Sequence, residues 1–246
     1  MKEFRADLHI HSVLSPCGDL DMSPRQIIGR ARQMQIDILG ISDHNSTRHG
    51  PLMRRLGKEN GIFVLTGAEV TSREEVHCLT FFEDDMQLAL FQEYLDRYIM
   101  AFPNDPERFG HQVVVDENGN IIDEEKNLLI YSIDQGVDQI AKTVHDLGGL
   151  FIPAHVNRQR NSMISQLGFI PQDIGADALE ISRHITKSEF LELYPSLAGF
   201  TFIQSSDAHF PADIGRACSL LRLGETSFSE IRMALLKEQG RGVVLP

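Results

Sequence analysis

Residues 4–12 of the chain read Phe-Arg-Ala-Asp-Leu-His-Ile-His-Ser. The apolar residues in this stretch predict a short buried strand over Phe4–Ile10. Because successive side chains of a strand point to opposite faces, His9 and His11 lie on one face, and Asp7 shares it. Three side chains that can bind a cation therefore leave a single strand on the same side.

Predicted strands and helices alternate along the chain, except in a middle section at about residues 102–131. Ser23 and Pro24 predict a helix start, with Ser23 as N-cap residue and Pro24 in the first helical position. This alternation predicts an α/β fold with parallel strands, and 246 residues suit one large domain over residues 1–246. The further strands expected are Ile36–Ser42, Ile62–Gly67, Val76–Phe82, Leu150–Ala154, Ala178–Ser182 and Phe200–Ser205, and the further helices are Thr47–Glu59, Met86–Met100, Ile133–Leu147 and Ser227–Lys237.

The middle section, at about residues 102–131, is predicted to be an insertion or lid within the domain. Asn118-Gly119 stands between two short β-prone runs and predicts a hairpin over Gln112–Ile122. The section is too short to bury a core of its own. Two interpretations stay open, a lid over a binding site and a surface decoration.

Composition narrows the class of protein. Hydrophobic residues make up 42% of the chain and the formal net charge is −12. No apolar run approaches the roughly 20 residues of a membrane span, and the N-terminus lacks a signal-peptide pattern, so we expect a cytoplasmic protein without a membrane partner.

Three cysteines do not suggest a disulfide framework. The negative charge leads us to expect no long nucleic acid as partner, whereas a small phosphorylated substrate fits if bound cations reverse the local field. The sequence predicts no oligomeric state.

Further histidines and carboxylates stand at the ends of successive predicted strands. Such strand ends form the active-site rim of barrel-like α/β folds. Imidazole suits zinc, iron and manganese, and a carboxylate can bridge two ions. Unrelated core histidines are the alternative, which the spacing of His9 with His11 and of Asp207 with His209 disfavours. The other residues of this kind are His44, Glu69, His77 and His155.

Five ordered motifs resemble those of the PHP (polymerase and histidinol phosphatase) family. The resemblance extends from residue 5 to about residue 220. It implies an α/β fold of the distorted (β/α)7 barrel type, here with a small hairpin-containing insertion. It also implies two or three divalent metal ions, Mn, Zn or Fe, as cofactors. The motifs are Asp7–Ser12, Ser42–His44, Gly67–Glu69, Ala154–His155 and Ser206–His209.

The resemblance also assigns ligands to the metals. It places His9, His11, Glu69 and Asp207 on the first ion, and Glu69, as a bridge, with His77 and His155 on the second. His44 and His209 would hold the third ion with one further ligand. The chain departs from the usual family pattern at this further ligand, for which Asp19 is favoured over Cys17.

The family resemblance implies metal-dependent hydrolysis of phosphate esters of small metabolites or nucleotides, by a metal-activated water. We hypothesise that Glu69 couples two metals and that Asp207 or His209 orients the water or protonates the leaving group. Arg158, Arg183 and Asn45 are the expected substrate contacts, because an arginine fork matches phosphate oxygens. Asp7 and Asp43 would either support ligating histidines or cap strand ends.

Three other functions remain open at this stage. A histidinol-phosphate phosphatase is one alternative, although no residue selects that substrate. A non-catalytic, metal-binding regulatory module is a second, which the nearly complete ligand set disfavours. A hydrolase of C–N bonds is a third, but none of the five motifs contains the metal-bridging lysine that such enzymes usually use.

Overall fold

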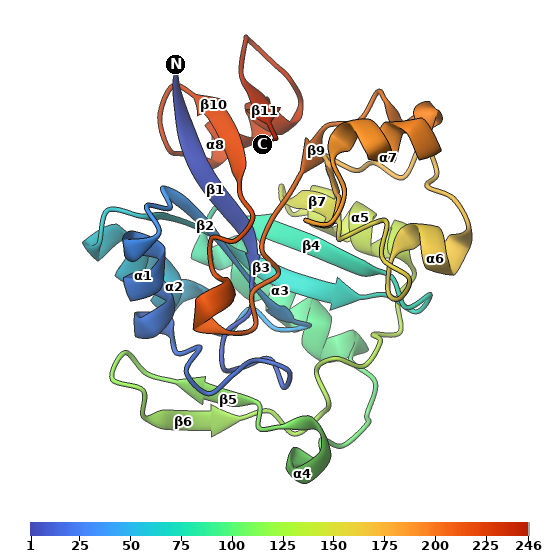
Figure 1. Cartoon of the computed structure of the whole chain (residues 1–246). Coiled ribbons are helices and arrows are strands. Elements are labelled where there is room, and N and C mark those ends of the chain that lie inside the picture. The colour runs from blue at the N-terminus through green and yellow to red at the C-terminus, as the bar shows by residue number, and fades with distance from the viewer. Residues whose placement is uncertain (246) are drawn as a thin grey trace.

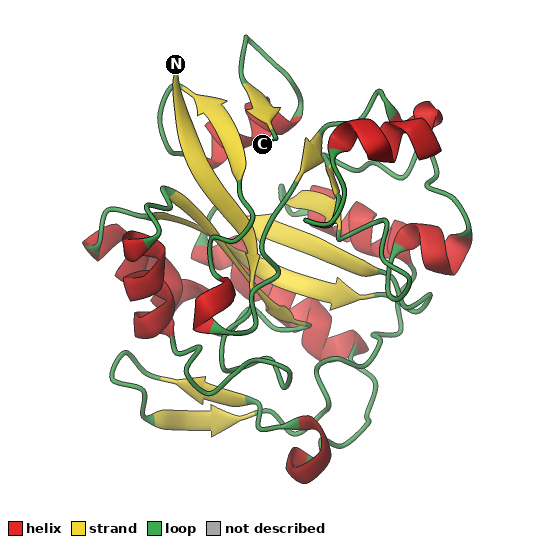
Figure 2. Cartoon of the chain, in the orientation of Figure 1, coloured by secondary structure: helices red, strands yellow, loops and turns green. Residues whose placement is uncertain are grey.

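The computed structural model describes residues 1–245. Seven strands form one curled sheet in the order β11-β10-β1-β2-β3-β4-β7 (Figure 1). Figure 2 shows this curved surface with helices packed around it. The strands of the sheet are β1 (Lys2–Ile10), β2 (Ile38–His44), β3 (Phe63–Thr71), β4 (His77–Phe82), β7 (Leu150–Pro153), β10 (Ser219–Leu223) and β11 (Gly242–Val244).

The strand directions correct one expectation. Strands β1, β2 and β3 are parallel, but β4 is antiparallel to both of its neighbours, β3 and β7. The reason is the short turn at residues 72–76, because a parallel pairing would need a crossover of a dozen or more residues. At the other edge, β10 and β11 are antiparallel additions that the sequence did not predict.

Two further strands cover the open side of this half-barrel. Strands β8 (Leu179–Glu180) and β9 (Phe202–Ile203) pair in parallel. On one side, the Val156 N–H donates to the Glu180 carbonyl at 2.8 Å; on the other, the His11 N–H donates to the Ala208 carbonyl at 3.0 Å. The expected distorted (β/α)7 barrel is therefore confirmed, with β8 and β9 joined to the sheet by irregular backbone contacts.

The helices cover the sheet and one end of the barrel. Ile27 and Met53, from the first two helices, pack with Ile10 and Leu39 in one buried cluster. The last helix packs with the strand residues in another cluster, at the end where β3 begins. None of the helices among residues 1–245 has the length and apolar character needed to span a membrane. The helices are α1 (Pro24–Gln33), α2 (Gly50–Glu59), α3 (Asp85–Tyr98), α5 (Val137–Asp146), α6 (Met163–Leu167), α7 (Lys187–Leu193) and α8 (Phe228–Leu235), with 3-10 turns η1 (Pro195–Leu197) and η2 (Pro211–Asp213).

The predicted hairpin is present in the middle section. Strands β5 (Val113–Val115) and β6 (Ile121–Glu124) pair antiparallel, and a short helix, α4 (Pro106–Phe109), precedes them. Arg25 and Arg55 both contact Glu117 at the tip of the hairpin. At the base, the Asn45 amide donates to two backbone carbonyls, of Leu129 and Tyr131. The insertion is thus attached to the barrel at both ends, and its role, as a lid or as a surface decoration, stays a prediction.

Substitution of Gly67 tests the close contact between β3 and β4. A Cβ atom at Gly67 would lie 1.6 Å from the Thr80 carbonyl oxygen. We expect Gly67→Ala to reduce the free energy of unfolding by at least about 2 kcal/mol, as overpacking does. Denaturant titration measures this change.

Gly29→Ala is the matched control for that substitution. Gly29 is exposed in α1, and a Cβ atom there would meet nothing within 4 Å. Alanine should stabilise this helix by up to about 1 kcal/mol. Equal stabilities of the two variants would contradict the packing described for Gly67.

Candidate metal centre

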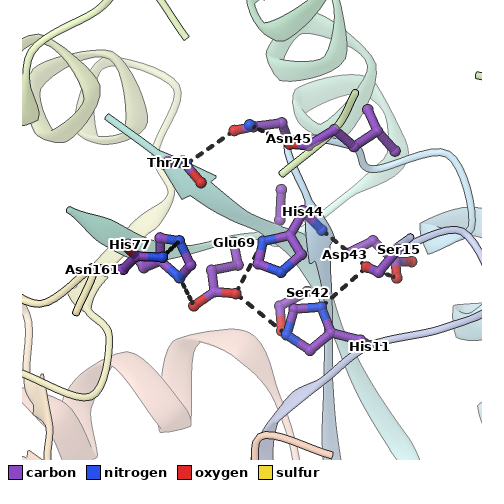
Figure 3. A network of polar contacts seen from close by, with 12 residues as sticks. His11, Ser15, Ser42, Asp43, His44, Asn45, Glu69, Thr71, His77 and Asn161 are labelled. Atoms are coloured by element: carbon purple, nitrogen blue, oxygen red, sulfur yellow. Dashed lines mark hydrogen bonds and ion pairs between the residues drawn. The ribbon is translucent and has the colours of Figure 1, made fainter. Parts of the chain in front are cut away.

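All predicted ligands except Asp19 come together at one end of the barrel, and Figure 3 shows His11, His44, Glu69 and His77 among them. His9 lies near the end of β1, and His44 ends β2 opposite Glu69 of β3. Because β4 runs in the reverse direction, its first residue, His77, lies at this same rim. The loops after β7 and β9 add His155 and the Asp207–His209 pair.

Two histidines and two carboxylates form the tightest group. The Nε2 atoms of His9 and His11 are 3.1 Å apart. Glu69 oxygens lie 3.3 Å from each of these nitrogens, and Asp207 Oδ1 lies 3.3 and 3.4 Å from them. A tetrahedral ion with bonds of about 2.0–2.1 Å needs ligand atoms about 3.3–3.4 Å apart. His9, His11 and Glu69 form a candidate ligand group for a divalent cation, and Asp207 approaches it from the side of the two histidines.

The opposite nitrogens of both histidines are held by buried partners. His9 Nδ1 lies 3.0 Å from Glu180 Oε2, and His11 Nδ1 lies 3.0 Å from Ser15 Oγ. Glu180 also accepts the His155 backbone N–H at 2.9 Å. Such partners orient ligating imidazoles and direct Nε2 to the metal. Sequence reasoning missed Glu180, although a single acidic residue in the apolar strand Ala178–Ser182 was a usable signal.

Glu69 connects this first group with the other histidines. Its Oε1 lies 2.9 Å from His77 Nδ1 and 3.1 Å from His155 Nε2. Its Oε2 lies 3.2 Å from His44 Nδ1. This arrangement fits a carboxylate that bridges two cations.

A third group of possible ligands consists of His11, His44 and His209. One nitrogen from each lies within 4.8 Å of the others. The His11 ring is 4.2 Å from that of His209 and 4.6 Å from that of His44, measured between ring centroids. The structure therefore places His11 between the first and third groups.

The charges in this cluster are balanced by protons on histidine. Burial disfavours charge on His9 and His11, but neighbouring carboxylates outweigh it, raising the pKa of His9 well above its usual value and that of His11 to about 9. Burial would raise the pKa of Glu69 and Asp207, yet the histidines hold both well below the usual range. Burial lowers the pKa of His209 to about 4. A divalent cation can take over this charge balance by displacing the protons.

Asp19 is not brought into these groups. Its Oδ1 accepts the Asp21 N–H at 2.8 Å, while its own backbone N–H donates to the His209 carbonyl. Cys17 is a free cysteine at an exposed position. Neither residue belongs to a candidate ligand group among residues 1–245. Asp19 as a metal ligand therefore stays a prediction, with Cys17 as the alternative.

The two aspartates with open roles make different contacts. Asp7 accepts the backbone N–H groups of Ser206 and Gly215, both at 2.9 Å, so it fixes the loop that carries Asp207. Asp43 accepts from Ser15 Oγ at 2.8 Å, and thereby supports the partner of His11. Asp7 acts as a loop anchor, whereas Asp43 supports a candidate ligand.

The three residues expected to contact substrate lie in different parts of the structure. A cavity of about 450 Å³ is lined by the histidine cluster and by Arg158, whose Nη1 lies 2.5 Å from Asp207 Oδ2. Arg183 lines a different cavity of about 350 Å³, together with Arg216. Sequence reasoning missed Arg160, an exposed neighbour that also lines the first cavity.

The Asn45 side chain is engaged in contacts within the fold, and its substrate role stays a prediction. Its side chain donates to two insertion carbonyls and accepts the Thr71 N–H at 3.0 Å. The residue is 1% exposed, so its amide is used in tying the insertion to β3. The position of Asn45 directly after a strand-end histidine is compatible with a structural contact and with a substrate contact, so the sequence alone could not distinguish them.

Comparisons with known proteins place the chain in a family. A model of the PHP domain matches residues 7–186. The uncharacterized protein MJ1587 of Methanocaldococcus jannaschii is 33% identical over 97 residues, which are 36% of this chain and 57% of that protein. The chain thus spans little more than half of this curated relative.

Solved structures share the fold. The lesion-specific endonuclease PfuEndoQ of Pyrococcus furiosus matches with a TM-score of 0.75 and 20% identity, over 98% of this chain and 58% of that one. A putative metal-dependent phosphoesterase of Bifidobacterium adolescentis matches with a TM-score of 0.64 and 19% identity, over 95% and 96% of the two chains.

One of these comparisons corrects the expectation about partners. An Endonuclease Q solved in complex with a 27-mer duplex carrying an abasic lesion matches 98% of this chain with a TM-score of 0.69. A long nucleic acid is therefore not excluded by the net charge of −12. Net charge sums the whole surface, whereas binding depends on the local field, and Arg158 and Arg160 line the cavity at the cluster.

Replacement of Glu69 tests the cluster directly. Glu69→Gln should lower the amount of bound divalent metal by at least one ion per chain, because the amide cannot supply a bridging charge. Elemental analysis of the purified protein measures the ratio. Glu75→Gln, the same change at an exposed position nearby, should leave it unchanged. Equal metal content in both variants would exclude Glu69 as a shared ligand.

The affinity for metal should also depend on pH. Because the pKa of His11 is about 9, its ring must lose a proton when a cation binds at neutral pH. Affinity should therefore rise about tenfold per pH unit for each proton displaced, between about pH 6.5 and 8.5. Calorimetry in buffers of different ionisation enthalpy measures the protons released. A flat affinity without proton release would refute the charge balance described above.

Proposed function

The chain belongs to the PHP domain family, and on this premise we propose that it hydrolyses phosphate esters with the help of two or three divalent metal ions. The observation that carries the proposal is the position of Glu69, which contacts His9, His11, His44, His77 and His155. Bound manganese, zinc or iron would supply an activated water and neutralise phosphoryl oxygens.

The chain itself supplies substrate contacts in this proposal. Arg158 reaches into the cavity of about 450 Å³ and pairs there with Asp207. A phosphate group can replace that carboxylate as the partner of the guanidinium fork. Asp207 and His209 line the same cavity, where they would orient the water or protonate the leaving oxygen.

The size of the substrate is a further part of the proposal. A phosphate ester held at the cluster would lie in the first cavity, so Arg158 would act on every substrate. Arg183 lies in its own cavity with Arg216, so it would contact only substrates that extend beyond the first cavity. The different positions of Arg158 and Arg183 therefore allow variants of the two residues to distinguish small phosphate esters from nucleic acids as substrates.

An activity screen tests the proposed function. Metal-free protein is assayed with p-nitrophenyl phosphate, bis-p-nitrophenyl phosphate, histidinol phosphate and single- and double-stranded oligonucleotides, with and without added Mn²⁺ or Zn²⁺. We expect metal-dependent release of phosphate or cleavage of a diester, reduced at least about 100-fold in Glu69→Gln. Bound metal without turnover of any ester would favour the non-catalytic, metal-binding module.

Arginine variants provide the control within the same screen. Arg158→Ala should raise KM about tenfold for all esters, since each has a phosphate in the first cavity. Arg183→Ala should leave small esters unaffected and weaken only longer substrates. Equal effects of both variants on a small ester would contradict the assignment of the two cavities.

A further inference from the structure

A continuous series of buried hydrogen bonds connects the hairpin to the metal centre. The Val115 N–H of β5 donates to His49 Nε2 at 3.0 Å, and His49 Nδ1 lies 2.7 Å from Ser12 Oγ. Ser12 Oγ donates to Asp43 Oδ2 at 2.6 Å. On the other side of the same carboxylate, Ser15 Oγ donates to Oδ1 at 2.8 Å. Figure 3 shows Asp43 and Ser15 next to His11.

The donors and acceptors in this series have a single consistent direction. Because His49 Nε2 accepts from a backbone N–H, the neutral ring carries its proton on Nδ1 and donates it to Ser12 Oγ. Ser15 Oγ uses its own proton on Asp43 and accepts the backbone N–H of His44 at 3.1 Å. It is then an acceptor for His11 Nδ1–H, at 3.0 Å. His11 therefore presents Nε2 to the cluster.

His49 has no other evident role among residues 1–245. It is 1% exposed, and burial lowers its pKa, which favours the neutral ring that the series requires. It belongs to none of the candidate ligand groups. A shift in the register of the hairpin falls between Val114 and Val115, where the N–H turns to His49. Irregularities of this kind commonly re-aim one group of a strand.

We propose that His49 is a positioning residue through which hairpin β5–β6 holds the candidate metal ligand His11 in its binding orientation. This inference rests on the metal site of the proposed function. It gives the hairpin a role at the metal site, because displacement of Val115 would free the His49 ring and loosen Ser12, Asp43 and Ser15 in turn. Groups that support a ligating histidine commonly contribute 10- to 100-fold to metal affinity.

Metal affinity of His49 variants tests this coupling. Competition titrations with Mn²⁺ and Zn²⁺ measure the dissociation constants of the intact protein. His49→Ala should weaken the affinity about tenfold. His49→Asn keeps a donor near Ser12, but its shorter side chain does not reach the Val115 N–H, so its affinity should fall between those of the wild type and the alanine variant. Turnover should recover in both variants when metal is raised to saturation.

The control is His111→Asn, an exposed histidine of the same insertion that pairs with Glu124. Its affinity and turnover should equal those of the wild type. If both His49 variants bind metal as the wild type does while their melting temperatures fall, His49 is only structural and the inference is wrong. If His49→Ala does not fold, the metal affinity of His49→Asn alone tests the inference by the same criterion. If the wild type binds no divalent ion, the metal site itself is wrong, and this outcome is distinct from a failure of the coupling.

Discussion

The Glu69 carboxylate is the contact on which the rest of the site depends. It is 1% exposed and lies within 3.3 Å of nitrogens from five histidines. A buried carboxylate is costly unless positive charge compensates it. The surrounding imidazoles meet this requirement as protonated partners, or as ligands that share a cation with Glu69. Either state ties strands β1, β2, β3 and β4 and the loop after β7 to one point.

The barrel is built so that these strands can reach that point. The reversal of β4 places its first residue, His77, beside Glu69, whereas a parallel strand would carry its first residue to the opposite end. Asp7 contributes at a greater distance, since it fixes the loop around Ser206 that carries Asp207. The positions of the candidate ligands therefore depend on the directions of the strands and on contacts that fix the loops.

The sequence could predict the parts of the site that local spacing controls. Two-residue spacing placed His9 and His11 on one face, and strand-end positions located Glu69 and His155. Spacing could not predict the direction of β4, because a tight turn and a crossover both begin with polar residues after a strand. Spacing also could not show that Asn45 binds the insertion, because its partner Leu129 lies 84 residues away in sequence. Glu180 was missed because its significance comes from His9, which only the fold brings within 3.0 Å.

The same limit applies to charge. The formal net charge of −12 is a property of the whole chain, whereas Arg158 and Arg160 line the cavity at the cluster. Electrostatic interactions between exposed charges fall off over about 8–10 Å at physiological salt. Distant acidic residues therefore contribute little at the cavity, whereas the groups lining it dominate. An acidic protein can bind an anionic substrate when its cations are gathered where the anion binds.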